Sequence, residues 1–431
     1  MFQTIRNAWK IEELRKKILF TLLIILIYRV GNAIPVPYVA VDALRNYFTT
    51  LQSTVFGLYN VMSGGAFSSA TIFALSIQPY INASIILQLL CIAIPALERM
   101  SKDEGEEGKK KIAAITRYST VGLGLLMGLA YYVLIRNNGL LSESGVWQGI
   151  VIVMTFTAGS ALLMWLGEQI TEFGVGNGIS IILFASIVSR FPTGIARMFQ
   201  NISLGTTTWY AVVLMLLGAL VIIVLIVLVT NAERRIPVQY SKRVVGRKMY
   251  GGQSTHLPLK VNMSGVMPII FAQSIASLPA TILMFFGITK ESTGFWGGFL
   301  RIFNANSLLY ALIYFLLIIF FSYFYATIQF NPVEIANNLK KNGGFIPGFR
   351  AGKPTSEFIQ KVLNKVTLFG AIYLSIIAVV PIIITCFSEK AANSGISLGG
   401  TSIIIVVGVA LETVKALEGQ MLMRHYKGFL E

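Results

Sequence analysis

Residues 209–231 read WYAVVLMLLGALVIIVLIVLVTN, an apolar run without an acidic or basic side chain. A helix needs about 20 such residues to cross the hydrocarbon core of a bilayer. A helix also satisfies its own backbone hydrogen bonds, which is the usual way for a chain rich in Leu and Ile to cross lipid. This stretch therefore predicts a transmembrane helix and places the chain among membrane proteins.

The composition extends this interpretation to the whole chain. Hydrophobic residues make up 55% of the 431 residues, charged residues make up 13%, and the mean hydropathy is +0.70. Soluble globular chains carry about 25% charged residues, so lipid suits this composition better than water. Ten long apolar runs lie near residues 18–37, 74–97, 113–135, 147–167, 179–196, 209–231, 264–287, 307–329, 366–387 and 398–418. We predict an all-α polytopic membrane protein with ten transmembrane helices, the fifth of them interrupted by Arg190 and Pro192.

The distribution of Lys and Arg predicts the orientation of these helices. With ten spans, the two termini and the connections on their side carry 27 basic residues, against seven on the opposite side and Arg29 inside the first span. Basic residues favour the cytoplasmic side of a membrane. Both termini are therefore predicted to be cytoplasmic. Topology and attraction to anionic lipids account for most of the net charge of +16.

The spans divide into two groups of five, residues 1–200 and residues 201–431. This division fits two halves of inverted topology, although no sequence repeat supports it. Two long basic connections, 232–263 and 330–365, contain turn-forming Gly and Pro and are predicted to be cytoplasmic binding loops. The N-terminal stretch FQTIRNAWKIEELRKK (2–17) suits an amphipathic helix on the cytoplasmic interface.

Several classes of chemistry are absent from the sequence. No GxxxxGK[ST] phosphate loop occurs. His256 and His425 lack partners at ligand spacing, and Cys91 and Cys386 lie in apolar runs, so neither a metal nor a disulfide is expected. The span interiors are almost empty of charge except for Arg29, whereas ion-coupled transporters place ionisable groups at the midplane. We expect a passive conduit without a cofactor or catalytic site. A small-solute or ion-coupled transporter is the second hypothesis, and a lipid-modifying membrane enzyme is the third.

Residues 54–73, TVFGLYNVMSGGAFSSATIF, are long enough to cross but too polar to face lipid. A crossing here would also invert the charge bias of every later connection. We predict a half-helix that folds back into the protein from the outer side, which is tolerated where it is buried or lines a cavity. An ordinary external loop is the alternative. The polar and glycine positions of this segment include Asn60, Ser63, Gly64, Gly65 and Ser68.

Five strings resemble the bacterial SecY family, which forms the channel of the Sec protein translocase. They are MSGGAFSSATIFALSIQPYINASIILQLL (62–90), GEQITEFGVGNGIS (167–180), GQSTHLPLKVNMSG (252–265), FNPVEIANNLKKNGGFIPGFRAG (330–352) and GGTSIIIVV (399–407). The resemblance implies two five-helix halves that form a clamshell around an hourglass pore. It also implies passage of unfolded secretory polypeptides across the bacterial cell membrane and sideways release of membrane segments into lipid.

The resemblance carries over a ring of aliphatic side chains at the pore constriction. The ring would comprise Ile77, Ile81, Ile179, Leu183, Ile270 and Ile405. Branched aliphatic groups that meet at a constriction dewet it, which blocks ions while a polypeptide can push the side chains apart. Leu183 stands where isoleucine is expected and remains hydrophobic. Without the resemblance, each of these residues would be interpreted as ordinary apolar packing.

The polar half-helix resembles the SecY plug, which fills the external funnel beside the ring. Glycines 64 and 65 each weaken helix propensity by about 1 kcal/mol relative to alanine, so we expect a weakly held segment. A crevice between the second and third spans on one side and the seventh and eighth on the other would open to lipid as a lateral gate. Asn82, Gln88 and Gln273 are polar candidates along it, and ordinary interhelical hydrogen bonding is the alternative.

The two basic loops predict cytoplasmic partners. Clustered Lys and Arg bind phosphate, so Arg243, Arg247 and Lys248 are candidates for contact with a ribosome. The string IPGFRAG resembles the IPGxRPG loop tip of the family, which implies that Arg350 serves the SecA motor. Ala351 replaces the family's proline, so we expect a less rigid tip. SecE, a small SecG-like subunit, signal peptides, unfolded polypeptides and membrane lipids are the other implied partners.

Overall fold

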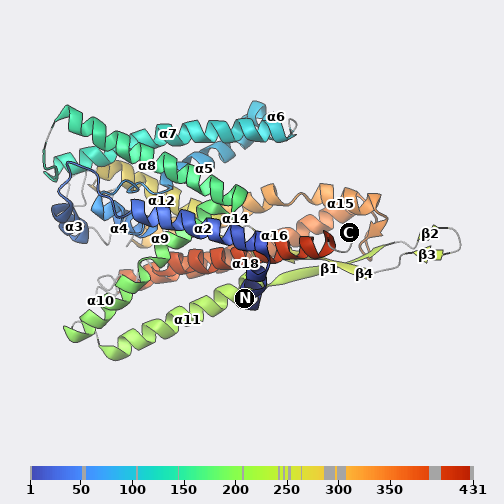
Figure 1. The fold of residues 1–431 in the computed structure, drawn as a ribbon. Coiled ribbons are helices and arrows are strands. Elements are labelled where there is room, and N and C mark those ends of the chain that lie inside the picture. The colour runs from blue at the N-terminus through green and yellow to red at the C-terminus, as the bar shows by residue number, and fades with distance from the viewer. Residues whose placement is uncertain are drawn as a thin grey trace.

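The computed structural model describes residues 2–427 apart from 51–54, 103–104, 144, 206–207, 241–242, 246–247, 251–253, 264, 286–296, 299–306 and 388–398. Long helices run side by side along one direction (Figure 1). The N-terminus, the last turns of α18 and the strands β1 and β4 lie at one end, called here the terminal end. Helices α3, α4 and α10 lie at the other end, called the distal end.

The first part of the chain forms helices only, apart from two isolated bridges among its described residues. They are α1 (Phe2–Lys10), α2 (Glu12–Gly31), α3 (Val41–Thr50), α4 (Val55–Met62), the 3-10 turn η1 (Phe67–Ser69), α5 (Gln78–Ala93), α6 (Pro95–Lys102), α7 (Gly105–Asn137), α8 (Val146–Phe173), α9 (Gly178–Val188) and α10 (Phe191–Ser203).

The second part combines helices with short strands. The helices are α11 (Trp209–Asn231), α12 (Met267–Phe285), α14 (Leu308–Gln329), α15 (Pro332–Lys341), α16 (Lys353–Phe387) and α18 (Gly399–Lys427). The strands are β1 (Glu233–Tyr240), β2 (Arg243–Val245), β3 (Lys248–Tyr250), β4 (Ser254–Lys260) and β5 (Gly344–Phe345).

Each of the ten predicted apolar runs falls on a helix, which confirms an all-α polytopic membrane protein. Six helical stretches of the described chain are long and apolar enough to span a bilayer by themselves. They are Gly105–Asn137, Val146–Phe173, Gly178–Gln200, Val212–Asn231, Leu308–Lys341 and Lys353–Ile384. Gln78–Ala93 and Met267–Pro279 are shorter apolar helices. The polar segment also contains the expected half-helix, α4.

The boundary of the first span was predicted wrongly. Helix α2 begins at Glu12 and ends at Gly31, whereas the apolar run suggested 18–37. The chain beyond Gly31 leaves the helix, and Val36 N donates to the carbonyl of Ala70 at 2.9 Å. Proline at 35 and 37 cannot donate to a helical carbonyl, which helps to end the helix. Arg29 therefore lies in the last turn of α2 instead of deep within a span.

The fifth run is interrupted where its Arg and Pro predicted. Helix α9 ends at Val188, and α10 starts at Phe191 with Pro192 in its first turn. Proline is tolerated there because the first N–H groups of a helix have no partner within it. The interruption places Arg190 in the connection between the two helices.

The two long loops contain regular structure that the sequence did not predict. Strands β1 and β4 pair antiparallel with Ile236 opposite Leu257, and β5 pairs with the end of β1. Ile236, Leu259 and Ile346 are buried together with Ile359 of α16 in a small core. The two loops are therefore joined at the terminal end and rest on α16.

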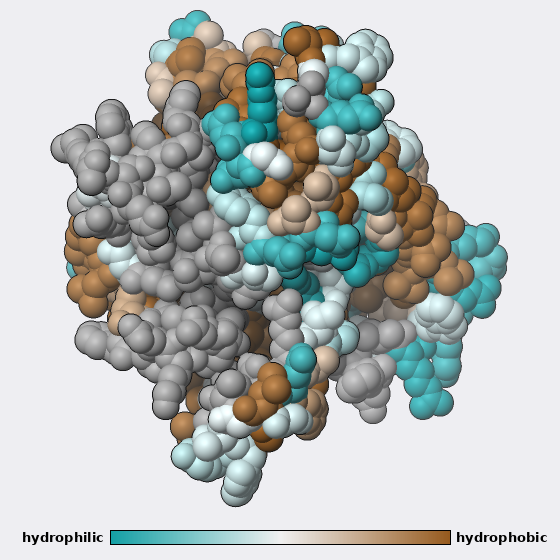
Figure 2. Space-filling model, turned by 90° about the vertical axis from the view of Figure 1, so that its left-hand side faces the viewer, coloured by the Kyte–Doolittle hydropathy of each residue, from teal (hydrophilic) through white to brown (hydrophobic). Residues whose placement is uncertain are grey.

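The main core lies where helices of the two predicted halves meet. Helices α5 and α12 pack against each other, as do α9 and α18. Side chains of α2, α5, α8, α9, α12, α14, α16 and α18 contribute to this core. By contrast, α11 exposes many apolar side chains, including Leu214 and Leu228. Figure 2 looks onto the distal end, where hydrophilic side chains lie across the middle of the described surface and again at its right-hand edge, with apolar ones between and around them.

Candidate pore constriction and plug

Five of the six expected ring residues are buried in the main core. Ile77 directly precedes α5, Ile81 lies on α5, Leu183 on α9, Ile270 on α12 and Ile405 on α18, and all belong to one hydrophobic cluster. The sixth, Ile179 on α9, is partly buried and packs against the same cluster. Four separate helical segments thus bring these aliphatic side chains together.

Gly167 of α8 shows how closely two of these side chains approach each other. A Cβ placed on Gly167 would lie 3.4 Å from Ile179 Cγ1 and 3.5 Å from Ile77 Cδ1. Both isoleucines therefore reach the same small residue on α8. Gly167 belongs to the string GEQITEFGVGNGIS, but no property of that string predicts this contact.

The glycine-rich string after α8 directs α9 towards the core. Asn177 caps α9, and its side-chain oxygen accepts from the N–H groups of Ile179 at 3.1 Å and Ser180 at 3.3 Å. A Cβ on Gly178 would lie only 1.9 Å from the carbonyl oxygen of Gly167. Glycine at 178 thus allows the start of α9 to press against α8. A short turn joins α8 to α9, with Gly176 at φ +72°.

The two glycines of the plug segment end α4 instead of weakening it from within. Gly65 N donates to the carbonyl of Asn60 at 2.8 Å, and Gly64 N donates to that of Val61 at 3.0 Å. These two bonds form a Schellman motif, the common glycine-dependent way to finish a helix. Both glycines have positive φ, +67° and +94°, which other L residues rarely adopt. They follow the last helical residue, Met62.

Polar contacts hold the turn after α4 in place. The hydroxyl of Tyr28 donates to the carbonyl of Ser63 at 3.2 Å and lies 2.6 Å from Ser186 Oγ. Asn32 Nδ2 donates to the same Ser63 carbonyl at 3.3 Å. Asn60, also buried, accepts from Ser68 N at 3.1 Å and so closes the turn internally. Helices α2 and α9 therefore both contact the turn.

An aromatic cluster holds the other side of the plug segment. Phe67 stacks on Tyr131 of α7 with ring centroids 4.6 Å apart, and on Phe56 of α4 at 5.6 Å. The Tyr131 hydroxyl donates to the Phe67 carbonyl, and Phe48 of α3 meets the Phe67 ring edge-on. The expectation of a weakly held segment overlooked these contacts, because they come from residues distant in sequence.

Met62 joins the plug segment to the expected ring. It belongs to the same hydrophobic cluster as the ring side chains. Its sulfur lies 3.1 Å from Gln78 Nε2 and 3.7 Å from Gln273 Nε2. Gln78 begins α5 and Gln273 lies on α12, so Met62 contacts both walls between which the crevice was predicted. Gln273 Oε1 is buried and has no hydrogen-bond partner within the described part of the chain.

The three lateral-gate candidates have different surroundings. Gln88 of α5 accepts from the hydroxyl of Tyr325 on α14, and its amide donates to Ser84 at 3.2 Å. Gln273 faces Met62 instead of bridging α5 and α14. Asn82 is half-buried on α5. Tyr325 was missed, since a tyrosine near the end of an apolar run is an ordinary feature of a span.

The loop candidates lie at the terminal end. Arg350 is exposed, and its carbonyl accepts from Thr355 Oγ1 at 2.8 Å. Phe349 stacks on Phe358 of α16 with ring centroids 4.1 Å apart. The tip is thus held on α16 despite Ala351. Arg243 begins β2 and Lys248 begins β3, while Arg247 lies outside the described residues.

The described residues contain no group of three or more His, Cys, Asp or Glu that could hold a metal ion, and Cys91 and Cys386 are free thiols. The combination that stands out is an aliphatic cluster between packed membrane helices, covered on one side by a re-entrant half-helix. This combination is typical of one class of protein, the membrane channels.

Comparison with known proteins identifies the family. The SecY family model matches residues 71–414. The chain is 45% identical to the protein translocase subunit SecY of Streptomyces scabiei, with full coverage of both chains. It is 43% identical to the same subunit of Thermotoga maritima, covering 100% of this chain and 98% of the relative. The chain belongs to the SecY family and is a protein-translocation channel.

Solved structures agree with this fold. A structure described as a protein conducting channel matches with a TM-score of 0.67 at 16% identity, covering 94% of this chain and 92% of the other. A structure concerned with the plug domain of SecY matches with a TM-score of 0.66 at 16% identity and the same coverage. Sec61 in a canine ribosome-channel complex matches with a TM-score of 0.61 at 14% identity, covering 94% and 92%.

Proposed function

We propose that the six aliphatic residues form the seal of a pore through which unfolded secretory polypeptides pass. Their burial in and against one cluster supports this role. So does the approach of Ile77 and Ile179 to the same glycine. A narrow apolar gap is costly to hydrate and therefore blocks ions. A polypeptide segment can displace flexible aliphatic side chains without breaking any hydrogen bond between them.

We infer from the position of Met62 how the crevice between α5 and α12 would open. Because Met62 contacts Gln78 at the start of α5 and Gln273 on α12, separating these two helices would remove contacts that hold the plug segment. Sulfur is a weak acceptor, so these two contacts add little to the apolar packing and the aromatic contacts that also hold the plug segment. Opening of the crevice and departure of the plug are thereby coupled.

Sideways release would use the crevice between α5 and α14. The Tyr325–Gln88 hydrogen bond crosses it and would act as a latch. A hydrogen bond of this kind within a membrane contributes about 0.6 kcal/mol on average. An apolar substrate segment of about 20 residues gains far more by entering lipid, so it can break the latch.

We propose that the terminal end lies in the cytoplasm of a bacterium. The loops there carry Arg350, Arg243, Arg247 and Lys248, the candidates for contact with the SecA motor and the ribosome. SecE and a SecG-like subunit are the proposed membrane partners, with signal peptides as ligands of the crevice. The chain is proposed to have no catalytic activity of its own, since work would be supplied by the motor or the ribosome.

Reconstitution tests the proposal. The purified chain is placed in liposomes with SecE, and SecA, ATP and an unfolded precursor are added. We expect protease-protected precursor inside the vesicles and no saturable uptake of small solutes. Uptake of a small substrate without precursor transport would favour the transporter hypothesis instead.

A further inference from the structure

The second half of α18 carries charged side chains that reach three neighbouring helices. Lys415 Nζ donates to the carbonyl of Thr230, in the last turn of α11, at 3.4 Å. Glu418 Oε1 accepts from Thr4 Oγ1 of α1 at 3.0 Å. Glu412 lies against the residues that lead into α12. Neither the proposed seal nor the proposed latch uses these three charged groups, so their role is open to a separate explanation.

The contact between α18 and the start of α12 is close. A Cβ placed on Gly265 would lie only 1.9 Å from Glu412 Oε1, and Gly265 has a φ of +63°. One turn earlier on α18, a Cβ placed on Gly408 would lie 2.2 Å from Val266 Cγ2. Positions 408 and 412 share one face of the helix, because they are four residues apart. Gly265 and Val266 therefore rest directly on that face, with the carboxylate of Glu412 against the backbone.

The charges on α18 match the helix ends that they face. The first N–H groups of a helix have no partner within it and carry partial positive charge, whereas the last carbonyls carry partial negative charge. The carboxylate of Glu412 accepts from the backbone N–H of Val266, directly before the first residue of α12. The ammonium of Lys415 meets a carbonyl at the end of α11. Both contacts are therefore electrostatically favourable.

We propose that Glu412 is a positioning residue for α12. Its carboxylate holds the start of α12 against α18 and so fixes one end of the helix that carries Ile270 and Gln273. This helix packs against α5 and forms one wall of the crevice. Without the carboxylate, α12 should move away from α5 more often. The consequence for opening rests on the proposed channel function, whereas the placement of α12 does not.

The placement of α12 is tested with spin labels on the full chain. The two native cysteines are replaced by Ser, and labels are attached to cysteines introduced at Ile86 of α5 and Ile282 of α12, both exposed positions. We expect Glu412→Gln to broaden the distribution of distances between the labels. Glu418→Gln is the matched control, because it removes the same charge from the same helix but at a contact with α1. Equal distributions in the parent and the Glu412 variant would overturn the proposal.

The effect on opening is measured as single-channel current across a planar bilayer. Glu412 is exposed, and a charge at an exposed helix N-terminus shifts an equilibrium by about two- to fivefold. We expect Glu412→Gln to raise the opening frequency by that factor and Glu418→Gln to leave it unchanged.

Gly265→Ala provides a second route to the same loss, because the added Cβ must displace the carboxylate. If both changes act through one contact, the double variant should open no more often than Gly265→Ala alone. Fully additive effects would overturn the proposal. A broadened distance distribution without more frequent opening would support the positioning of α12 by Glu412 and contradict the proposed link between the crevice and opening.

Discussion

The hydroxyl of Tyr28 lies 3.2 Å from the carbonyl oxygen of Ser63, so the first membrane helix holds the turn that ends the half-helix of the plug. Tyr28 is fully buried, and Ser186 of α9 lies on the other side of its hydroxyl. This one side chain therefore connects α2, α9 and the plug segment. Its removal should affect the plug before it affects the fold.

Tyr28→Phe should loosen the plug. The change keeps the ring and removes one hydrogen bond, at a cost of about 1 kcal/mol. We expect more frequent, brief openings in single-channel recordings across a planar bilayer, with an unchanged melting temperature within a few degrees. Tyr118→Phe is the control, since Tyr118 is 79% exposed on α7. If the variant opens no more often than the parent in these recordings, Tyr28 does not hold the plug.

Replacing several ring residues by Ser should give steady ion leakage. The combination Ile81→Ser, Leu183→Ser and Ile270→Ser would hydrate the constriction, because the barrier to ions is the cost of wetting an apolar gap. Deleting residues 60–70 should give weaker, flickering currents, since the ring remains and a neighbouring segment can partly reseal the pore. Both are measured as single-channel current.

The control for the ring is Ile135→Ser. Ile135 is as deeply buried as the ring residues but belongs to the aromatic cluster around the plug. This variant should lower stability without steady leakage. If correctly inserted ring variants are as tight as the parent, the six residues are packing residues and the pore lies elsewhere.

Gly167→Leu should separate two ring side chains. A Cβ there already comes within 3.5 Å of Ile77 and Ile179, so a larger side chain must displace both. Overpacking of this kind costs about 1–3 kcal/mol, and we expect both a lower melting temperature and increased conductance. Gly122→Leu on α7 is the matched control, because a Cβ there meets nothing within 4 Å. Equal behaviour of the two variants would contradict the placement of Gly167 beside the seal.

Tyr325→Phe should ease sideways release. Loss of the bond to Gln88 removes the proposed latch between α14 and α5. A substrate segment of marginal hydrophobicity should then insert into the bilayer about threefold more often, because a bond worth about 0.6 kcal/mol shifts an equilibrium by that factor. Insertion is scored by glycosylation or protease mapping of the segment. Tyr210→Phe, at an exposed position of α11, should leave the insertion yield unchanged.

Arg350→Glu should abolish motor-dependent export while the chain remains inserted. The side chain is exposed, and the loop is held through the carbonyl of Arg350 and the ring of Phe349, so charge reversal leaves the fold intact. Reversal at a contact surface disturbs recognition more than packing. Export is measured with SecA, and Lys361→Glu, exposed on α16, is the control. Unchanged export would show that Arg350 contributes only to the orientation of the chain in the membrane and not to motor recognition.

Much of the secondary structure followed from local patterns. The apolar runs, the interruption at Arg190 and Pro192, and the half-helix of α4 were all predicted, because each depends on the hydropathy or backbone preference of neighbouring residues. The antiparallel pairing of β1 with β4 was not predicted. Ile236 and Val238 alternate with Pro237 in β1, but proline within a short run argues against a strand, so the pairing could not be inferred from the pattern.

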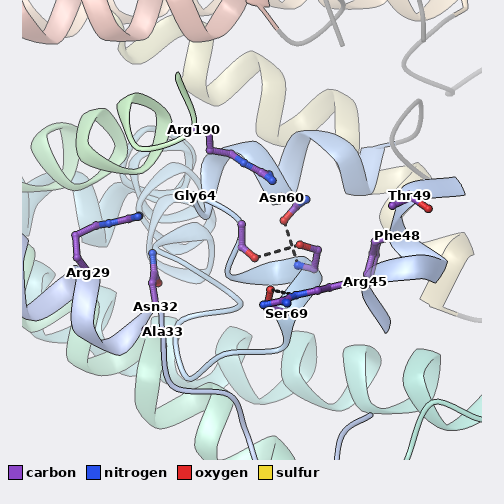
Figure 3. A pocket seen from close by; sticks show the side chains of 12 residues that line it. Arg29, Asn32, Ala33, Arg45, Phe48, Thr49, Asn60, Gly64, Ser69 and Arg190 are labelled. Atoms are coloured by element: carbon purple, nitrogen blue, oxygen red, sulfur yellow. Dashed lines mark hydrogen bonds between the residues drawn. The ribbon is translucent and has the colours of Figure 1, made fainter. Parts of the chain in front are cut away.

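The sequence by itself determined that the chain lies in lipid, which apolar segments form helices, and the family. Preference for lipid is a sum over individual side chains, and the family motifs are contiguous strings. Only the tertiary structure decided which side chains meet. Tyr28 and Ser63 are 35 positions apart, and Gln88 and Tyr325 are 237 apart. A polar cavity beside the plug segment (Figure 3) is likewise lined by Arg29, Arg45 and Arg190, which come from three separate parts of the chain. Such approaches depend on how helices pack and where each one ends, and no local pattern of residues encodes these distances.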